Sequence, residues 1–234
     1  MTSVVDTITK PIRGFVPTVT KQCWGFMIGS AFFALGSAPA FSTWLGSGGA
    51  NLLFFVGAIF FTVAGFIQLF LSGAMTVDVD FAPGRMVRAE WLTAAAQSFG
   101  TIMFNMSTTA ALHARTLRAE EKLVWNPDAS GSVAFLISGF FAFVAHAHVA
   151  KAVDPTKVAW WSLVLNFVGC VAFAFSAVGA YIKPNGDVYD NTLANWGTFI
   201  GALCFLFASL IVLPWWSRNK SGQDIQSGTQ NKAK

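Results

Sequence analysis

The sequence predicts an all-α polytopic membrane protein, with six transmembrane helices arranged as three tandem helical hairpins. Three observations predict it: charge is scarce, the charges leave six long stretches free, and a glycine–phenylalanine spacing recurs along the chain. Charged residues make up 11% of the 234 residues, whereas soluble domains contain about 25%. So few charges do not cover a water-facing surface. The composition therefore argues against a soluble enzyme and against a nucleic-acid-binding protein.

Six stretches of 19 to 24 residues contain no Asp, Glu, Lys or Arg. A bilayer core of about 30 Å requires roughly 20 apolar residues in a helix. Phe, Leu, Ala and Gly dominate without the alternation of a membrane β-strand, so the stretches predict helices and not a barrel. We expect an N-terminal arm (1–22), a transmembrane domain (23–216) and a disordered polar tail (217–234). The expected helices are 23–45, 51–72, 91–112, 132–150, 158–181 and 193–216.

The first stretch also has features of a signal peptide. Basic residues precede its apolar run, and Ala38-Pro39-Ala40 resembles a small-residue cleavage site. The stretch continues to Leu45 after a long polar leader. We therefore expect a retained helix that Pro39 kinks or ends, with cleavage as the alternative.

The distribution of basic residues predicts the orientation. Eleven Lys and Arg residues fall on the side of the two termini, and four fall on the opposite side. Positively charged loops stay in the cytoplasm, so we expect a multi-pass protein of the cell membrane with both termini cytoplasmic. The formal charge of +4 then belongs to residues that border the lipid bilayer, and it requires no nucleic-acid partner.

The third observation is the spacing of glycine and phenylalanine. Each odd-numbered stretch has a glycine followed by Phe four residues later and a small residue seven later: Gly29, Phe33 and Gly36; Gly100, Phe104 and Ser107; Gly169, Phe173 and Ser176. The even-numbered stretches contain the pairs Gly57 and Phe61, Gly139 and Phe143, and Gly201 and Phe205. These offsets place the residues on one helical face. We predict three parallel hairpin repeats whose glycines allow close helix packing.

The first hairpin resembles a known two-helix domain. Residues 29–37 read GSAFFALGS, and residues 51–61 read NLLFFVGAIFF after a short turn. This pattern, best over residues 24–72, is similar to the YrhK-type domain, which occurs in prokaryotic membrane proteins without an assigned reaction. The resemblance implies a membrane location and no activity.

The segment from His113 to Gly131 is the longest predicted outer connection. We expect its charged residues to extend the third helix by a turn or two. Asn126-Pro127-Asp128 then predicts a turn, and Ser130 or Ser132 predicts the N-cap of the fourth helix. The connection is either a solvated turn or a docking surface for a partner.

A few polar residues lie inside the predicted spans. Gln97, Asn105 and Thr109 belong to the third stretch, and Asn166 belongs to the fifth. They predict either a polar lining for a small neutral solute or hydrogen bonds between helices. No Asp, Glu, Lys or Arg lies within a stretch, which argues against an ion-coupled carrier and leaves His146 as the possible exception.

The sequence predicts no cofactor, metal or catalytic residues. His113 and His146 lie near opposite ends of their stretches, and His146 and His148 point to different sides of a helix. The odd number of cysteines, two of them mid-span, predicts apolar filling and not a disulfide framework. No phosphate-binding loop, nucleophile elbow or zinc-protease motif is present in the sequence.

These observations predict a non-enzymatic integral membrane protein, an accessory or scaffold component that packs against itself or other membrane proteins. The alternative is a small pore or facilitator for a neutral solute, lined by Gln97, Asn105, Thr109 and Asn166. A third possibility, a lipid-modifying enzyme, requires His146 and a border acid such as Glu90 to converge.

Overall fold

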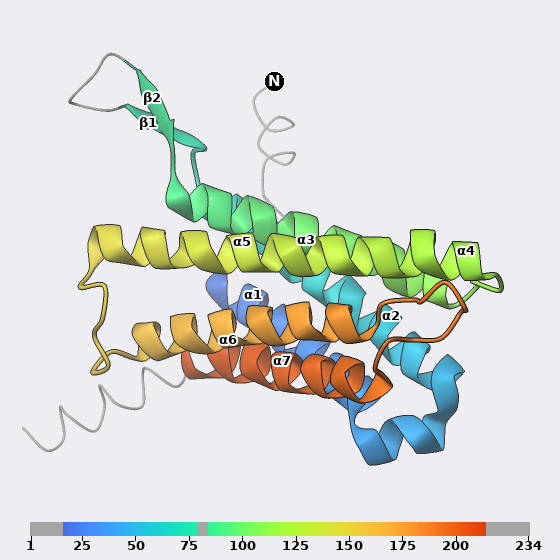
Figure 1. Ribbon diagram of the computed structural model, residues 1–234. Helices are drawn as coiled ribbons and strands as arrows, with labels where there is room; N and C mark the ends of the chain where they lie inside the picture. Colours follow the sequence, from blue (N-terminus) through green and yellow to red (C-terminus); the bar gives the residue numbers. More distant parts are fainter. Residues whose placement is uncertain (1–15, 79–83, 214–234) are drawn as a thin grey trace, which may run out of the picture.

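The structure is a computed structural model, and it describes residues 16–78 and 84–213 of the chain. The described chain is mostly helical, as the sequence predicts, with long helical segments that lie side by side (Figure 1). These segments are α1 (Val19–Ser37), α2 (Pro39–Leu71), α3 (Ala89–Ala111), a continuous run of α4 (Leu117–Ala119), η2 (Glu120–Trp125) and α5 (Asn126–Val149), α6 (Val158–Gly179) and α7 (Asn191–Ile211).

The helices form a closed ring in sequence order. Each helix packs against the next, from α1 through α2, α3, α5 and α6 to α7, and α7 packs against α1. Short connections between successive helices make neighbours antiparallel. The hairpins α1/α2, α3/α5 and α6/α7 have the most extensive contacts. The ring therefore surrounds a common axis, and each helix runs from one end of this axis to the other.

A small β-hairpin joins α2 to α3. Strands β1 (Thr76–Asp78) and β2 (Arg85–Val87) are antiparallel, and Val77 is paired with Met86. Figure 1 shows this hairpin extending away from the helices. An ion pair of 3.3 Å joins Arg85 to Asp78, but both side chains are exposed. Water screens such a pair, so the ion pair contributes little to stability.

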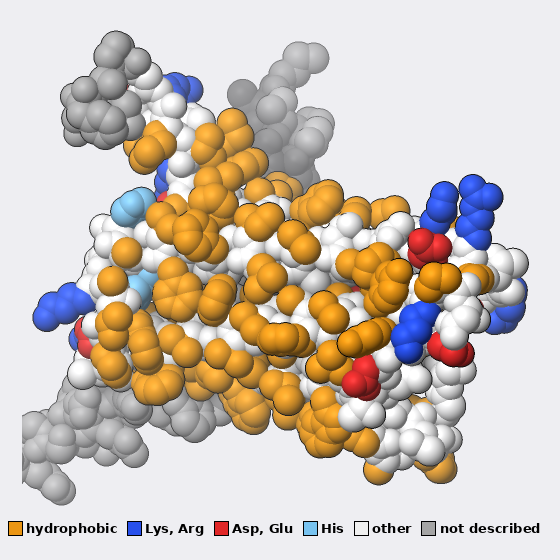
Figure 2. Space-filling view, viewed as in Figure 1, with side chains coloured by type: hydrophobic (Ala, Val, Ile, Leu, Met, Phe, Trp, Pro, Cys, Tyr) orange, Lys and Arg blue, Asp and Glu red, His pale blue; other side chains and the backbone are white. Residues whose placement is uncertain are grey.

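The surface of the bundle fits a lipid environment. In Figure 2, hydrophobic side chains cover the middle of the bundle, whereas acidic and basic side chains gather near its two ends. Four helical segments of the described chain are long and apolar enough to cross a membrane: Pro39–Leu71, Leu117–Val149, Val158–Gly179 and Asn191–Ile211. The protein is therefore a multi-pass integral membrane protein in contact with the lipid bilayer. α1 and α3 are more polar than these four segments, since α1 contains Lys21 and Gln22 and α3 contains Glu90, Gln97 and Asn105.

The expected helix 23–45 is not continuous. α1 ends at Ser37, and Pro39 begins α2, because Pro has no N–H and is tolerated only in the first turn of a helix. A second break follows at Gly46, whose φ of 68° is strained for any residue with a side chain. The expected turn between 45 and 51 is therefore one break within α2.

The expected helix 132–150 begins much earlier than predicted. α3 ends at Ala111, and the charged residues that follow start the next helix instead of extending α3. Asn126-Pro127-Asp128 is helical and not a turn. Thr116, not Ser130 or Ser132, is the N-cap, since its side chain accepts a hydrogen bond from the Ala119 N–H.

A π-helix explains how the chain continues through Pro127. In η2 the hydrogen bonds skip one residue more than in an α-helix, and the Asn126 N–H donates to the Glu121 carbonyl. This wider turn gives room for a proline ring that otherwise collides with the carbonyl four residues before it. The remaining expected helices begin and end within a few residues of α3, α6 and α7. Residues 1–15 of the arm, 214–216 of the last span and the tail lie outside the described part of the chain.

Candidate functional site: two chambers and a phenylalanine plug

A short motif recurs once in each of the six packed helices. A glycine is followed by a small residue, and Phe comes four residues after the glycine. The small residue is at most 2% exposed in every copy, and the Phe is at most 4% exposed. The six copies are Gly29-Ser30 with Phe33, Gly57-Ala58 with Phe61, Gly100-Thr101 with Phe104, Gly131-Ser132 with Phe135, Gly169-Cys170 with Phe173, and Gly201-Ala202 with Phe205.

The glycines of this motif meet in pairs within the hairpins. A Cβ atom built on Gly29 would lie 2.8 Å from the Gly57 carbonyl oxygen, and one on Gly57 would lie 2.9 Å from the Gly29 oxygen. The pair Gly169 and Gly201 repeats this contact at 3.1 Å in both directions. Backbones approach this closely only where both residues lack a side chain.

The second hairpin corrects the predicted register. Gly100 packs against Gly131 of α5, with 3.0 Å between a built Cβ and the opposite carbonyl oxygen in both directions. Gly139, eight residues later, packs instead against Phe167 of α6, and Gly36 packs against Phe54. The even-helix member of this repeat is therefore Gly131 with Phe135, not Gly139 with Phe143.

The six phenylalanines fill the axis of the ring in two layers. Phe33, Phe104 and Phe173 come from the first helix of each hairpin, and their ring centroids lie 5.6 to 6.3 Å apart. The other layer has Phe205 between Phe61 and Phe135, at 6.2 and 5.5 Å. Within each hairpin the two rings lie 5.0 to 5.4 Å apart. We name these six residues the phenylalanine plug; each ring pair adds about 0.5–1.5 kcal/mol beyond its buried area.

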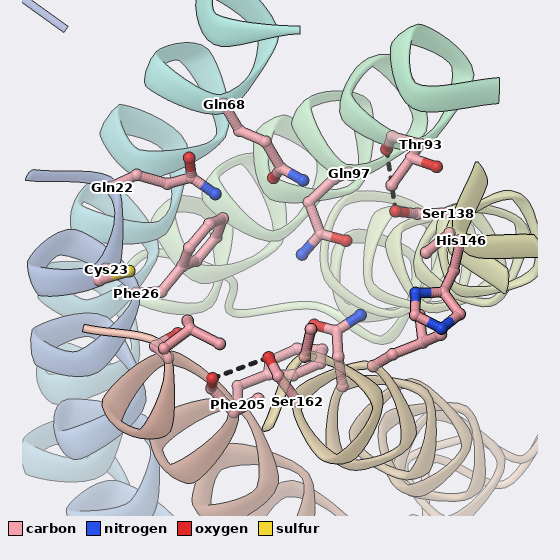
Figure 3. Close-up of a pocket in the computed structure, with 17 residues that line it drawn as sticks. Gln22, Cys23, Phe26, Gln68, Thr93, Gln97, Ser138, His146, Ser162 and Phe205 are labelled. Atoms are coloured by element: carbon pink, nitrogen blue, oxygen red, sulfur yellow. Dashed lines mark hydrogen bonds between the residues drawn. The ribbon is translucent and has the colours of Figure 1, made fainter. Parts of the chain in front are cut away.

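A polar cavity of about 350 Å³ lies on one side of the phenylalanine plug. All six helices contribute to its wall, at the end of the bundle where α1 begins. Phe26 and Phe205 form part of the wall, and the polar residues include Gln22, Gln68, Gln97 and Asn166. We name this cavity the amide chamber. Figure 3 shows the side chains of Gln22, Gln68, Gln97 and His146 directed toward one space from α1, α2, α3 and α5.

Several polar atoms of the amide chamber have no hydrogen-bond partner in the described part of the chain. They are Oε1 of Gln68, Oε1 of Gln97 and Nε2 of His146. Two of its hydroxyls are engaged, since Ser138 donates to the Thr93 carbonyl at 2.9 Å and Ser162 donates to the Ala208 carbonyl at 2.9 Å. Gln97 is 4% exposed. An unpaired buried amide costs about 1–3 kcal/mol, so water or a bound solute in the chamber would stabilise these groups.

A second cavity, of about 610 Å³, lies on the other side of the phenylalanine plug. Phe33, Phe104 and Phe173 form its floor, and its wall contains two carboxylates, Glu120 and Asp128. We name it the acidic chamber. Both acids come from the predicted outer connection, where Glu120 was expected in an extension of the third helix and Asp128 in a turn. Asp128 therefore lies within a helix that is long enough to span the bilayer.

The structure separates the four residues that the sequence proposed as a polar lining. Gln97 and Asn166 line the amide chamber, whereas Asn105 and Thr109 line neither chamber. Asn105 donates to the Ala58 carbonyl at 2.7 Å and to Thr62, so it joins α3 to α2. Thr109 is exposed on the outer surface of α3. Gln22 and Gln68, which the sequence analysis did not assign to a lining, complete the amide chamber.

The remaining candidate groups do not form a reactive centre among the described residues. His113, just after the end of α3, hydrogen-bonds to the carbonyl of Thr109. The three cysteines are free, and Cys170 lies next to Gly169 beside the phenylalanine plug. The described part of the chain contains no cluster of three or more His, Cys, Asp or Glu residues that could hold a metal ion.

Comparison with known proteins does not extend this description. No family model, no curated protein and no solved structure matches the chain. The resemblance of the first hairpin to the YrhK-type domain stays a prediction.

Proposed function

We propose that this protein is a non-enzymatic facilitator that passes a small uncharged solute across the cell membrane, with all six helices spanning the bilayer. The observation that carries the proposal is the pair of polar chambers on one axis, separated only by the phenylalanine plug. Each chamber is lined by all of the long helical segments, so both are central to the ring. The plug then acts as the gate, which is closed in this structure.

The polar composition of α1 and α3 supports this arrangement. Several of their polar side chains face the inside of the ring, since Gln22, Thr93 and Gln97 line the amide chamber and Ser107 and Thr108 line the acidic chamber. A helix that contributes to an axial cavity has less need of apolar residues than one surrounded by lipid. α1 has 19 residues and α3 has 23, and at 1.5 Å per residue both approach or exceed the thickness of a bilayer core.

An accessory or scaffold role has less support. The sequence suggested it because the spans contain many small residues that allow helices to associate. Gly29, Gly57, Gly100, Gly169 and Gly201 all pack against helices of the same chain. These glycines are therefore not available as contacts for a second protein.

Solute flux in liposomes tests the proposal. The purified protein is reconstituted, and the equilibration of glycerol and acetamide is followed by stopped-flow light scattering. We expect faster equilibration than in protein-free liposomes. Phe104 contacts three other rings of the plug, at 5.0, 5.6 and 6.3 Å, so Phe104→Ala opens the gate and raises the flux severalfold.

Loss of a buried phenylalanine costs about 3–5 kcal/mol of stability, so the milder Phe104→Leu is measured in parallel. Phe99, on the outer face of the same helix and 51% exposed, provides the control Phe99→Ala, which leaves the flux unchanged. Flux equal to that of protein-free liposomes in the wild type and in both folded Phe104 variants would contradict the proposal.

A further inference from the structure

The amide chamber is built to hold a ligand of one chemical class. We propose that it is a binding site for a small uncharged primary amide, which Gln97 and Gln68 contact through hydrogen bonds. This inference rests on the proposed function, since it names the substrate class of the facilitator, but binding to the chamber is measured independently of flux.

The first argument is charge. Among the described residues, no Asp, Glu, Lys or Arg lines the amide chamber, and His146 is the basic side chain in its wall. A cation finds no carboxylate in this wall and an anion finds no Lys or Arg, so a charged ligand would lose part of its hydration without full compensation. The chamber therefore selects uncharged molecules, in contrast to the acidic chamber with Glu120 and Asp128.

The second argument is the balance of donors and acceptors. A carboxamide side chain presents a coplanar oxygen and NH₂ group, and the same groups of a primary amide ligand are complementary to it. Glutamine and asparagine use this geometry when they bind the planar edge of adenine with two hydrogen bonds. The amide oxygens of Gln68 and Gln97 are buried without a partner among the described residues, and an amide that rotates by about 180° around its last side-chain bond presents its oxygen to an NH₂ group in the chamber.

The third argument is position and size. Gln97 is 4% exposed and is directed into the chamber from α3, while Gln68 approaches from α2 (Figure 3). The volume of about 350 Å³ corresponds to roughly ten water molecules at about 30 Å³ each. A ligand of a few heavy atoms fits, together with water that bridges it to the more distant amides.

Acetamide and acetate form a matched pair of probes, because they have nearly the same shape and differ in charge. Binding of each to the full-length protein in detergent is followed by saturation-transfer difference NMR of the methyl group. We expect a methyl signal for acetamide, and we expect propionamide to reduce it by competing for the same site. For acetate we expect a signal at least about tenfold weaker, because its desolvation is not compensated.

The variant Gln97→Leu removes the amide and keeps a side chain of similar size. Because the removed oxygen has no partner, the variant retains its fold. We expect acetamide to bind about threefold to tenfold more weakly, which corresponds to the loss of one neutral hydrogen bond. The control Thr109→Val changes a polar residue of the same helix that lies outside both chambers, and it leaves acetamide binding unchanged.

The outcomes separate the two proposals. Equal acetate and acetamide signals, or acetamide binding that Gln97→Leu does not weaken, would overturn the amide site even if the protein conducts solutes. Specific acetamide binding without flux in liposomes would support the site and contradict the facilitator. If ethylene glycol binds as well as acetamide and loses binding equally in Gln97→Leu, the chamber accepts any hydrogen-bonding solute and the amide class is wrong.

Discussion

The two chambers differ in chemistry although the helices that enclose them repeat. The described lining of the amide chamber contains no Asp, Glu, Lys or Arg, and its amides come from four helices, with Gln22, Gln68, Gln97 and Asn166 on α1, α2, α3 and α6. The acidic chamber is larger, and both of its carboxylates come from the single segment Leu117–Val149. The repeated glycines and phenylalanines thus define a symmetric barrier, whereas the unrepeated polar residues make its two sides chemically distinct.

The largest effect is expected where the barrier shared by both chambers is disturbed. A Cβ atom on Gly100 would lie 2.5 Å from Cδ1 of Phe135 and 3.0 Å from the Gly131 carbonyl oxygen. Gly100→Ala therefore displaces a plug residue and a neighbouring backbone at once, and overpacking of this kind costs about 1–3 kcal/mol. We expect a lower midpoint in thermal unfolding of the detergent-solubilised protein and weaker acetamide binding.

Gly48 offers a matched control, since a Cβ atom there meets nothing within 4 Å. Gly48→Ala is neutral or stabilises α2 by up to about 1 kcal/mol, because alanine is the better helix former. Equal thermal-unfolding midpoints for the two alanine variants would show that the phenylalanine plug tolerates displacement. The plug would then not be a rigid barrier between the two chambers.

The sequence predicts the barrier better than the chambers. The spacing Gly-x-x-x-Phe identifies five of the six motif copies, because it depends only on residues within one helix. It fails in α5, where Gly131 with Phe135 and Gly139 with Phe143 satisfy the same pattern. The contact with Gly100 on the neighbouring helix distinguishes them. The residue after the glycine agrees with this contact, since the small Ser132 follows Gly131 whereas the bulky Phe140 follows Gly139.

The chambers depend on relationships that no single stretch contains. Gln68 and Gln97 are 29 positions apart and meet because α2 and α3 are antiparallel neighbours. The acidic chamber was missed because Pro127 predicts a turn, and the π-helix that carries the chain through it has no simple sequence pattern. Asn105, the most central amide in sequence, instead joins two helices. Depth in a span thus identified a polar residue but not the direction that it faces.

A smaller effect is expected from the acidic chamber alone. Asp128 is half-buried and makes no hydrogen bond or ion pair with another described residue. Holding its carboxylate away from bulk water is unfavourable, so we expect Asp128→Asn to raise the stability by about 1 kcal/mol. Acetamide binding remains unchanged because the phenylalanine plug lies between this residue and the amide chamber.

The control for this variant is Glu121→Gln, an exposed residue of the same helical segment, which leaves both the thermal midpoint and the binding unaltered. A change in acetamide affinity in Asp128→Asn would indicate that the two chambers communicate through the closed plug. In that case they would form one site and not two.

The smallest structural change tests which chamber faces the cytoplasm. Val153, before α6, is 68% exposed, and Tyr189, after α6, is 56% exposed. Val153→Cys and Tyr189→Cys leave the fold intact. The native Cys23 and Cys170 are buried, and the half-buried Cys204 is removed by Cys204→Ala in both variants, so native thiols do not compete for label. Lys151 and Lys157 flank Val153, so the positive-inside rule places that loop in the cytoplasm.

We expect an impermeant maleimide to label Tyr189→Cys on intact cells, and Val153→Cys only after permeabilisation. The amide chamber then faces the cytoplasm. The reverse labelling would invert the protein, and labelling of both variants on intact cells would mean that α6 does not cross the membrane.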